Sequence, residues 1–164
     1  MKISLEYYFT KLNKDTLTYH SNTIDITNKK TSPDDILLKH LLQITPLIQN
    51  EIIMKFIIHS TSWRYDNNTI TLSYLIYSDY FNPENLGDTT SMNISKLKMT
   101  KSESHIKPSP KSIKPYHVIS HAMRHLAFLI HNGNYDHYDQ NLTPQTIEKL
   151  RYIKEELSGG FENP

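Results

Sequence analysis

The sequence predicts a single α+β domain, in which an antiparallel sheet built from two hairpins is covered by about three helices. Two stretches alternate apolar and polar residues and are each interrupted by a polar turn, as hairpins are. Three other stretches repeat apolar residues every three or four positions, which is typical of helices that cover a sheet. We expect one domain over residues 1–164, because a chain of 164 residues has the size of one domain and shows no internal repeat.

The first predicted hairpin comprises residues 3–9 and 17–26, joined through Asn13-Lys14-Asp15. The second comprises residues 52–64 and 69–77. Within it, residues 52–58 form a nearly continuous apolar run, which predicts a central strand covered on both faces. Asn67 and Asn68 supply the turn, because asparagine tolerates a positive φ.

Capping residues mark the helices. Ser32 precedes Pro33, and Thr143 precedes Pro144, so both pairs read as an N-cap followed by proline at the first helical position. Pro46 is expected to kink the first helix or to end it near Thr45. The predicted helices cover residues 33–45, 116–131 and 144–158.

Residues 80–114 lack clear periodicity and predict a long basic loop within the domain. Lys96 to Lys114 contains six lysines and one acid, Glu103. Loops of this length are commonly functional or disordered, and a lid over the following helix is one possible role. The lysine-rich part, residues 96–114, has no interleaved aromatic residue, and the whole chain carries a net charge of only +1. Both facts argue against nucleic acid as a partner.

Composition excludes several classes of site. The chain has no cysteine, so disulfides, thiolate metal sites and cysteine nucleophiles are excluded. Four glycines and the absence of a glycine-rich motif argue against a glycine-cradled phosphate loop. No apolar run has the length of a membrane span, and Glu6 interrupts the segment where a signal peptide would lie. We expect a cytoplasmic protein without a membrane partner, and the sequence names no cofactor.

The predicted helix over residues 116–131 carries most of the side chains that could bind a ligand or take part in a reaction. His117, His121 and His125 stand four residues apart, which places them on one side of a helix. The same side carries Arg124 and Phe128, together with His131. The opposite arc is apolar and predicts the core face: Val118, Ile119, Ala122, Met123, Leu126, Leu129 and Ile130. A helix face of His, Arg and Phe without carboxylates is unusual for a solvated surface, so we expect a protein segment or a ligand to cover it.

Three interpretations of this histidine-rich helix remain open. A pair of histidines four apart matches the spacing of metal ligands, with His59 as the third candidate ligand. His117 and His125 are too far apart along the helix to share one ion. Alternatively, His121, Arg124 and His125 bind a phosphate or carboxylate. In the third interpretation the rings pack against the second hairpin and the basic loop, and backbone groups satisfy their nitrogens.

A second cluster ends the apolar strand, where hydroxyl residues, the only Trp and one of three Arg follow one another: His59-Ser60-Thr61-Ser62-Trp63-Arg64. Strict alternation would place His59 and Trp63 on one face and Arg64 on the other, unless a bulge intervenes. His-x-Thr is half of the motif pair of two-histidine phosphoesterases, but the second half is missing. The His-Ser-Thr-Ser-Trp-Arg segment and the helix motif His-Ala-x-Arg-His-Leu-Ala together resemble a family of bacterial proteins of unknown function. The resemblance covers roughly residues 56–130 and implies no activity.

These observations predict a binding pocket for a small anion, such as phosphate or a nucleotide, formed by His59, Arg64, His121, Arg124 and His125. The alternative is a noncatalytic interaction or assembly protein whose His and Phe face meets a protein partner. The second alternative is a metal-dependent enzyme with histidine ligands, although the sequence assigns no metal residues.

Overall fold

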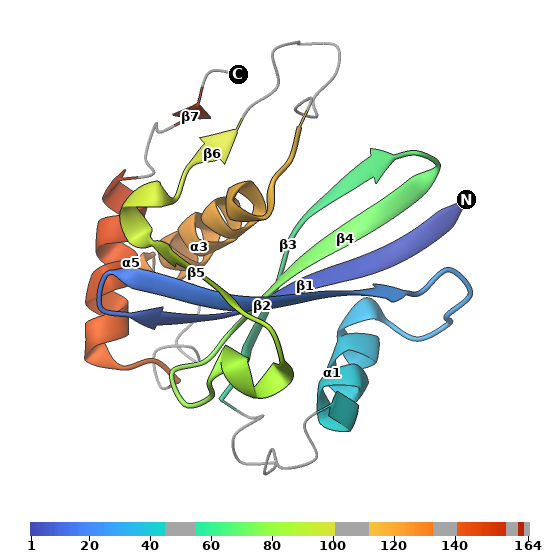
Figure 1. The fold of residues 1–164 in the computed structure, drawn as a ribbon, viewed down its shortest axis with the longest axis horizontal. Helices are drawn as coiled ribbons and strands as arrows, with labels where there is room; N and C mark the ends of the chain where they lie inside the picture. Colours follow the sequence, from blue (N-terminus) through green and yellow to red (C-terminus); the bar gives the residue numbers. More distant parts are fainter. Residues whose placement is uncertain (45–54, 101–111, 133–140, 157–160, 163–164) are drawn as a thin grey trace.

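The computed structural model describes residues 1–44, 55–100, 112–132, 141–156 and 161–162, and shows an α+β fold (Figure 1). The main strands are β1 (Lys2–Asn13), β2 (Thr16–Asp25), β3 (Ile57–Asp66), β4 (Thr69–Tyr77) and β5 (Thr90–Asn93). A two-stranded ladder joins β6 (Met99–Thr100) to β7 (Phe161–Glu162). The helices are α1 (Pro33–Ile44), α3 (Pro115–His131) and α5 (Pro144–Glu156).

The five-stranded sheet has the order β3-β4-β1-β2-β5 and is mixed. Both predicted hairpins are present, since β1 pairs antiparallel with β2 and β3 pairs antiparallel with β4. However, β1 and β4 run parallel, from the pair Lys2 and Thr69 to the pair Thr10 and Tyr77. The expected purely antiparallel sheet is therefore wrong. Local alternation predicts each hairpin, but which edges of the two hairpins meet is decided by tertiary packing.

The central strand of the sheet is β1, where an unbroken run from Ser4 to Thr10 is buried. The apolar segment 52–58 was expected in that position. Instead, β3 begins only at Ile57 and lies at one edge of the sheet, while residues 52–54 fall outside the described part. The second half of β3 is polar and mostly exposed, as is common in an edge strand.

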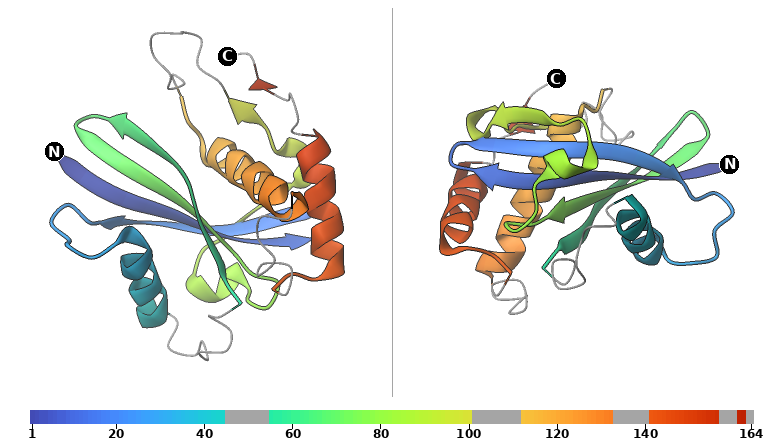
Figure 2. Two further views of the ribbon diagram at one scale, coloured as in Figure 1. Left: turned by 180° about the vertical axis from the view of Figure 1, so that it is seen from behind. Right: turned by 60° about the horizontal axis from the view of Figure 1, so that its bottom comes forward.

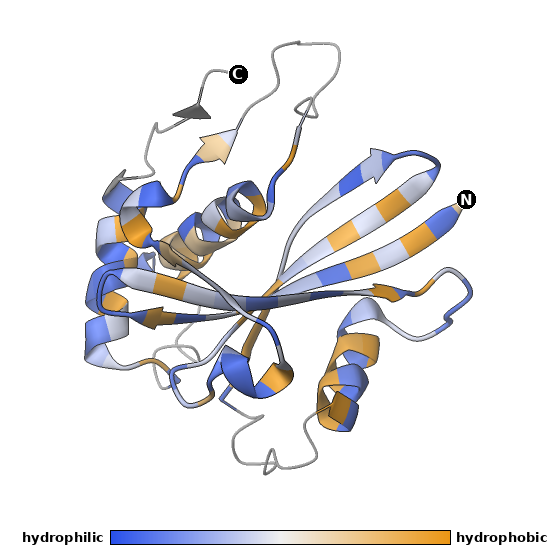
Figure 3. Ribbon diagram, viewed as in Figure 1, coloured by the Kyte–Doolittle hydropathy of each residue, from blue (hydrophilic) through white to orange (hydrophobic). Residues whose placement is uncertain are grey.

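Two hydrophobic cores lie on the two faces of the sheet. Successive side chains of a strand point to opposite faces, so Tyr8 and Leu12 of β1 belong to one core and Leu5, Tyr7 and Phe9 to the other. Figure 3 shows apolar and polar positions alternating along part of the sheet. The first core includes the apolar faces of α3 and α5, and the second includes Leu37 and Leu41 of α1. Accordingly, α3 and α5 lie together at one end of the twisted sheet and α1 lies at the other (Figure 2).

The helix signals are confirmed. The Asp35 backbone N–H donates to the Ser32 hydroxyl over 3.2 Å, and the Thr146 N–H donates to the Thr143 hydroxyl over 3.3 Å. The predicted core arc of α3 is buried, except that Leu129 is only partly so. The expected helix ends at Pro46 and near residue 158 fall outside the described residues.

The segment expected as one long basic loop contains short elements. A 3₁₀ turn, η1 (Pro83–Leu86), leads to β5, which pairs with β2 as the fifth strand. A second turn, η2 (Ile94–Lys96), and β6 follow, and Ile94, Leu97 and Met99 join the first core. Strands and turns this short have too few residues to show a period. Residues 101–111, which carry the remaining expectation of a lid, lie outside the described part. Among the described helices, none is long and apolar enough to span a membrane.

Candidate functional site

The candidate site begins at a β-bulge in β3. The register of β3 against β4 shifts between Ser60 and Ser62, so that Thr61 is the additional residue and its hydroxyl donates to the Ser73 carbonyl over 3.0 Å. An extra residue reverses the alternation that follows it. Thus His59 and Arg64 share the face of the sheet that α3 covers, and Trp63, paired with Leu72, lies on the α1 face.

The bulge brings His59 against the helix. His59 Nε2 lies 2.8 Å from His125 Nδ1, and the ring centroids are 4.7 Å apart with an angle of 59° between the planes. Burial lowers the pKa of His59 to about 4, with further lowering by the charges of His125 and His121. The His59 ring is therefore neutral at neutral pH, and it orients His125 through the contact with His125 Nδ1.

His121 lies one helical turn before His125, with 6.4 Å between their ring centroids. Burial lowers the pKa of His121, and the positive charges of His125 and Arg124 lower it further. A hydrogen bond to the Thr61 carbonyl acts in the opposite direction, because the ring N–H donates to this bulge residue. The bulge thus anchors one ring directly and another through His59.

His121, Arg124, His125 and Phe128 line a depression with a volume of about 220 Å³. Arg124 Nη1 points to the sulfur of Met99 on β6 over 3.6 Å. On α5, Lys154 Nζ lies 5.7 Å from the centre of the Phe128 ring. Among the described residues no carboxylate lines this depression.

Arg64 shares the face but does not line the depression. Both of its terminal nitrogens donate to the Glu6 carboxylate, Nη2 to Oε2 over 2.6 Å, and Nη1 also reaches the Ser73 hydroxyl. The Glu6 side chain is only 10% exposed and that of Arg64 28%. The hydrogen bond to Glu6 raises the pKa of Arg64, so this guanidinium serves a structural ion pair.

The rest of the histidine face of α3 is unevenly covered. His117 is buried, its Nδ1 accepts from the Lys114 backbone N–H over 3.2 Å, and its ring lies 4.2 Å from that of Tyr116. His131 is partly buried, whereas His121, His125 and Phe128 are exposed. The first ring of the face therefore packs against backbone, and the rings in its middle remain accessible.

Four residues in or beside the site were not predicted from sequence. Lys154 and Met99 reach the site from separate elements, and no local pattern indicates that α5 and β6 pack there. Glu6 did carry a signal, since an acid on a buried face of a strand requires a partner. The extra Thr61 had no sequence signature.

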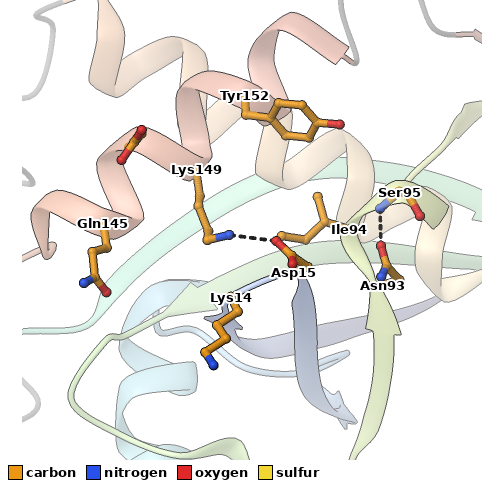
Figure 4. A pocket seen from close by; sticks show the side chains of 9 residues that line it. Lys14, Asp15, Asn93, Ile94, Ser95, Gln145, Lys149 and Tyr152 are labelled. Carbon is orange, nitrogen blue, oxygen red and sulfur yellow. Dashed lines mark hydrogen bonds and ion pairs between the residues drawn. The ribbon is translucent and has the colours of Figure 1, made fainter.

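A larger cavity, of about 850 Å³, lies between the β1–β2 turn, η2 and α5 (Figure 4). Lys149 of α5 forms a 3.1 Å ion pair with Asp15 across it, while Lys14 and Tyr152 lie at its margins. Opposite charges offset one another along this lining, since Glu148 contributes a second acid. The cavity thus selects for neither an anion nor a cation, and none of the sequence-predicted site residues line it.

Comparisons with known proteins add no family. No protein-family model matches the chain, and no curated protein matches it. Within the described residues, no group of three or more His, Asp or Glu side chains is arranged to hold a metal ion. The metal-dependent enzyme therefore remains a prediction without a ligand set in that part of the chain.

Proposed function

We propose that the protein binds a small anion, such as phosphate or a phosphate ester, in the depression lined by His121, Arg124, His125 and Phe128. The observation that carries this proposal is the lining itself, which combines a guanidinium and two imidazoles without a carboxylate among the described residues. Arginine presents a planar fork of donors to phosphate oxygens, and imidazoles add further N–H groups. His59 is part of the site because it orients His125, while Arg64 belongs to the Glu6 pair.

Thermal unfolding in the presence of sodium phosphate tests the proposal. A ligand at about 100 times its Kd stabilises a protein by about 2.7 kcal/mol, which raises the Tm of a domain of this size by about 5–10 °C. We expect this rise in the wild type and its loss in Arg124→Gln. Arg151→Gln is the matched control, because it removes the same charge from an exposed position on α5. Equal shifts in all three proteins would mean that phosphate acts nonspecifically.

A noncatalytic protein-interaction role is the second candidate, and the exposure of Phe128 favours it, since 48% of this residue is exposed. Light scattering after size-exclusion chromatography distinguishes the two candidates. Self-assembly that Phe128→Glu abolishes, together with an unchanged Tm in phosphate, supports interaction over anion binding. A monomer that phosphate stabilises supports the anion pocket.

A further inference from the structure

Phe128 forms an apolar wall in a pocket whose other lining residues are Arg124 and two histidines. Its ring stands four residues after Arg124 on α3, which corresponds to about 6 Å along the helix. Both side chains line the same depression. An anion held by Arg124 therefore has an aromatic surface about one helical turn away.

Lys154 adds a cation beside the Phe128 ring, although it does not line the pocket. Its ammonium lies over the Phe128 ring, 5.7 Å from the centroid, and it comes from a different helix, α5. The packing of α5 on α3 buries Leu150 and Ile153, which fixes where α5 passes the ring. The Phe128 ring thus shares its depression with Arg124 and has the Lys154 ammonium over it.

The volume limits the size of the occupant. About 220 Å³ is smaller than the roughly 300–1,000 Å³ of sites that enclose drug-sized ligands. The part of a ligand that lies inside the depression is therefore small, on the scale of a phosphate group with one ring.

We propose that the ligand is a phosphate monoester that carries a single aromatic ring close to the phosphate. The phosphate contacts His121, Arg124 and His125, and the ring stacks on Phe128. Stacking on a phenyl ring accepts many different aromatic rings, and it adds affinity beyond that of the charged group. This inference rests on the proposed anion pocket and specifies the part of the ligand that charge alone does not select.

Calorimetric titrations with phenyl phosphate, cyclohexyl phosphate and methyl phosphate test it. These probes share the phosphate and differ in the group attached: an aromatic ring, a saturated ring of similar size, or a methyl group. We expect the wild type to bind phenyl phosphate at least about fivefold more tightly than either of the other two. Phe128→Leu removes this preference for the phenyl ester, because leucine keeps an apolar side chain but has no ring on which the ligand could stack. Arg124→Gln weakens the binding of all three.

The outcomes separate this inference from the proposed function. Equal affinities for the three esters, or a preference for phenyl phosphate that persists in Phe128→Leu, would overturn the aromatic ligand and leave the anion pocket in place. A preference for both ring compounds alike would show that the wall recognises apolar bulk, which also overturns the inference. Failure of all three esters to bind overturns the pocket and the inference together.

Discussion

The contact between His59 and His125 sets a requirement on their protonation. A hydrogen bond between two imidazoles needs one nitrogen with a lone pair, so at least one ring must be neutral. Burial lowers the pKa of His59 to about 4, which makes His59 neutral under ordinary conditions. Whether His59 donates or accepts, the Nδ1 of His125 is occupied, and Nε2 is the nitrogen left for a ligand.

The lowered pKa of His59 predicts a pH dependence of stability. The unfolded chain protonates this histidine below its ordinary value of 6.5, whereas the folded chain resists protonation until about pH 4. The contribution is therefore fully present above pH 6.5 and is lost as the pH falls toward 4. Because the ring is partly exposed, we expect a loss of about 1–2 kcal/mol. Urea unfolding at pH 7 and pH 5 should show this loss in the wild type and a smaller one in His59→Gln. Parallel losses in both proteins would contradict it.

At the scale of elements, the bulge in β3 determines which side chains meet. Strict alternation assigns His59 and Arg64 to opposite faces, and the extra Thr61 places them on the same one. The two side chains make different contacts: His59 contacts His125 on α3, and Arg64 extends across β4 to bind Glu6 on β1. A single inserted residue thus supplies both the candidate site and the ion pair beside it.

The Glu6–Arg64 pair should be strongly coupled. Arg64→Met leaves a nearly buried carboxylate without its cation, which costs about 3 kcal/mol. The double variant Glu6→Gln/Arg64→Met should recover part of this loss, with a coupling free energy of about 1–3 kcal/mol in urea unfolding. Lys2 and Asp25 serve as the control, because their side chains lie 3.7 Å apart and are 59% and 58% exposed. Their coupling should stay below about 1 kcal/mol. Similar coupling in both pairs would show that the burial of Glu6 is energetically unimportant.

The extent to which the sequence predicted the site follows from this geometry. Helical spacing alone placed His121, Arg124 and His125 together, because residues three and four apart share a helix face. The strand pattern also singled out His59, although the structure places it near the start of β3 and not at its end. Arg64 lies outside the depression because it pairs with Glu6 on another strand, and no local pattern indicates this partner. The acid that binds Arg64 is 58 positions away in the sequence.

At the scale of the whole molecule, Asp79 links the end of β4 to the start of α5. Its Oδ1 accepts from the buried Tyr77 hydroxyl and from Thr146, each over 2.7 Å, and its Oδ2 accepts from the Thr143 backbone N–H over 2.7 Å. This carboxylate therefore holds α5 against the sheet, and α5 in turn places Lys154 over Phe128. A residue outside the candidate site thus contributes to its shape.

We expect Asp79→Asn to destabilise the fold by about 2 kcal/mol, because an amide places an N–H where a hydroxyl or backbone N–H already donates. Hydrogen exchange should accelerate in α5 more than in β1. Asp66→Asn is the matched control at the exposed last residue of β3, and it should change stability by less than about 0.5 kcal/mol. Uniform acceleration of exchange across the molecule would argue against a specific tether on α5.

Local patterns predicted the two hairpins and the three helices, but they did not predict how these elements combine. Cap residues and periodicity act within about a dozen positions, which suffices for α1 and for the β3–β4 hairpin. The parallel contact of β1 with β4 joins residues far apart in the chain, and the β5 strand is too short to show alternation. Both depend on packing that emerges only when the whole sheet forms.

The parallel ladder also has a consequence during synthesis. Both hairpins close across turns of a few residues, whereas β1 meets β4 only after pairs such as Ser4 and Thr71, 67 positions apart, come together. During synthesis β1 leaves the ribosome before β4. Until β4 is also available, one edge of β1 is unpaired and its apolar side chains are uncovered. An unpaired edge of this kind binds other strands readily. The same strand that becomes the most protected in the finished protein is therefore the one most exposed to misassembly while the chain is being made.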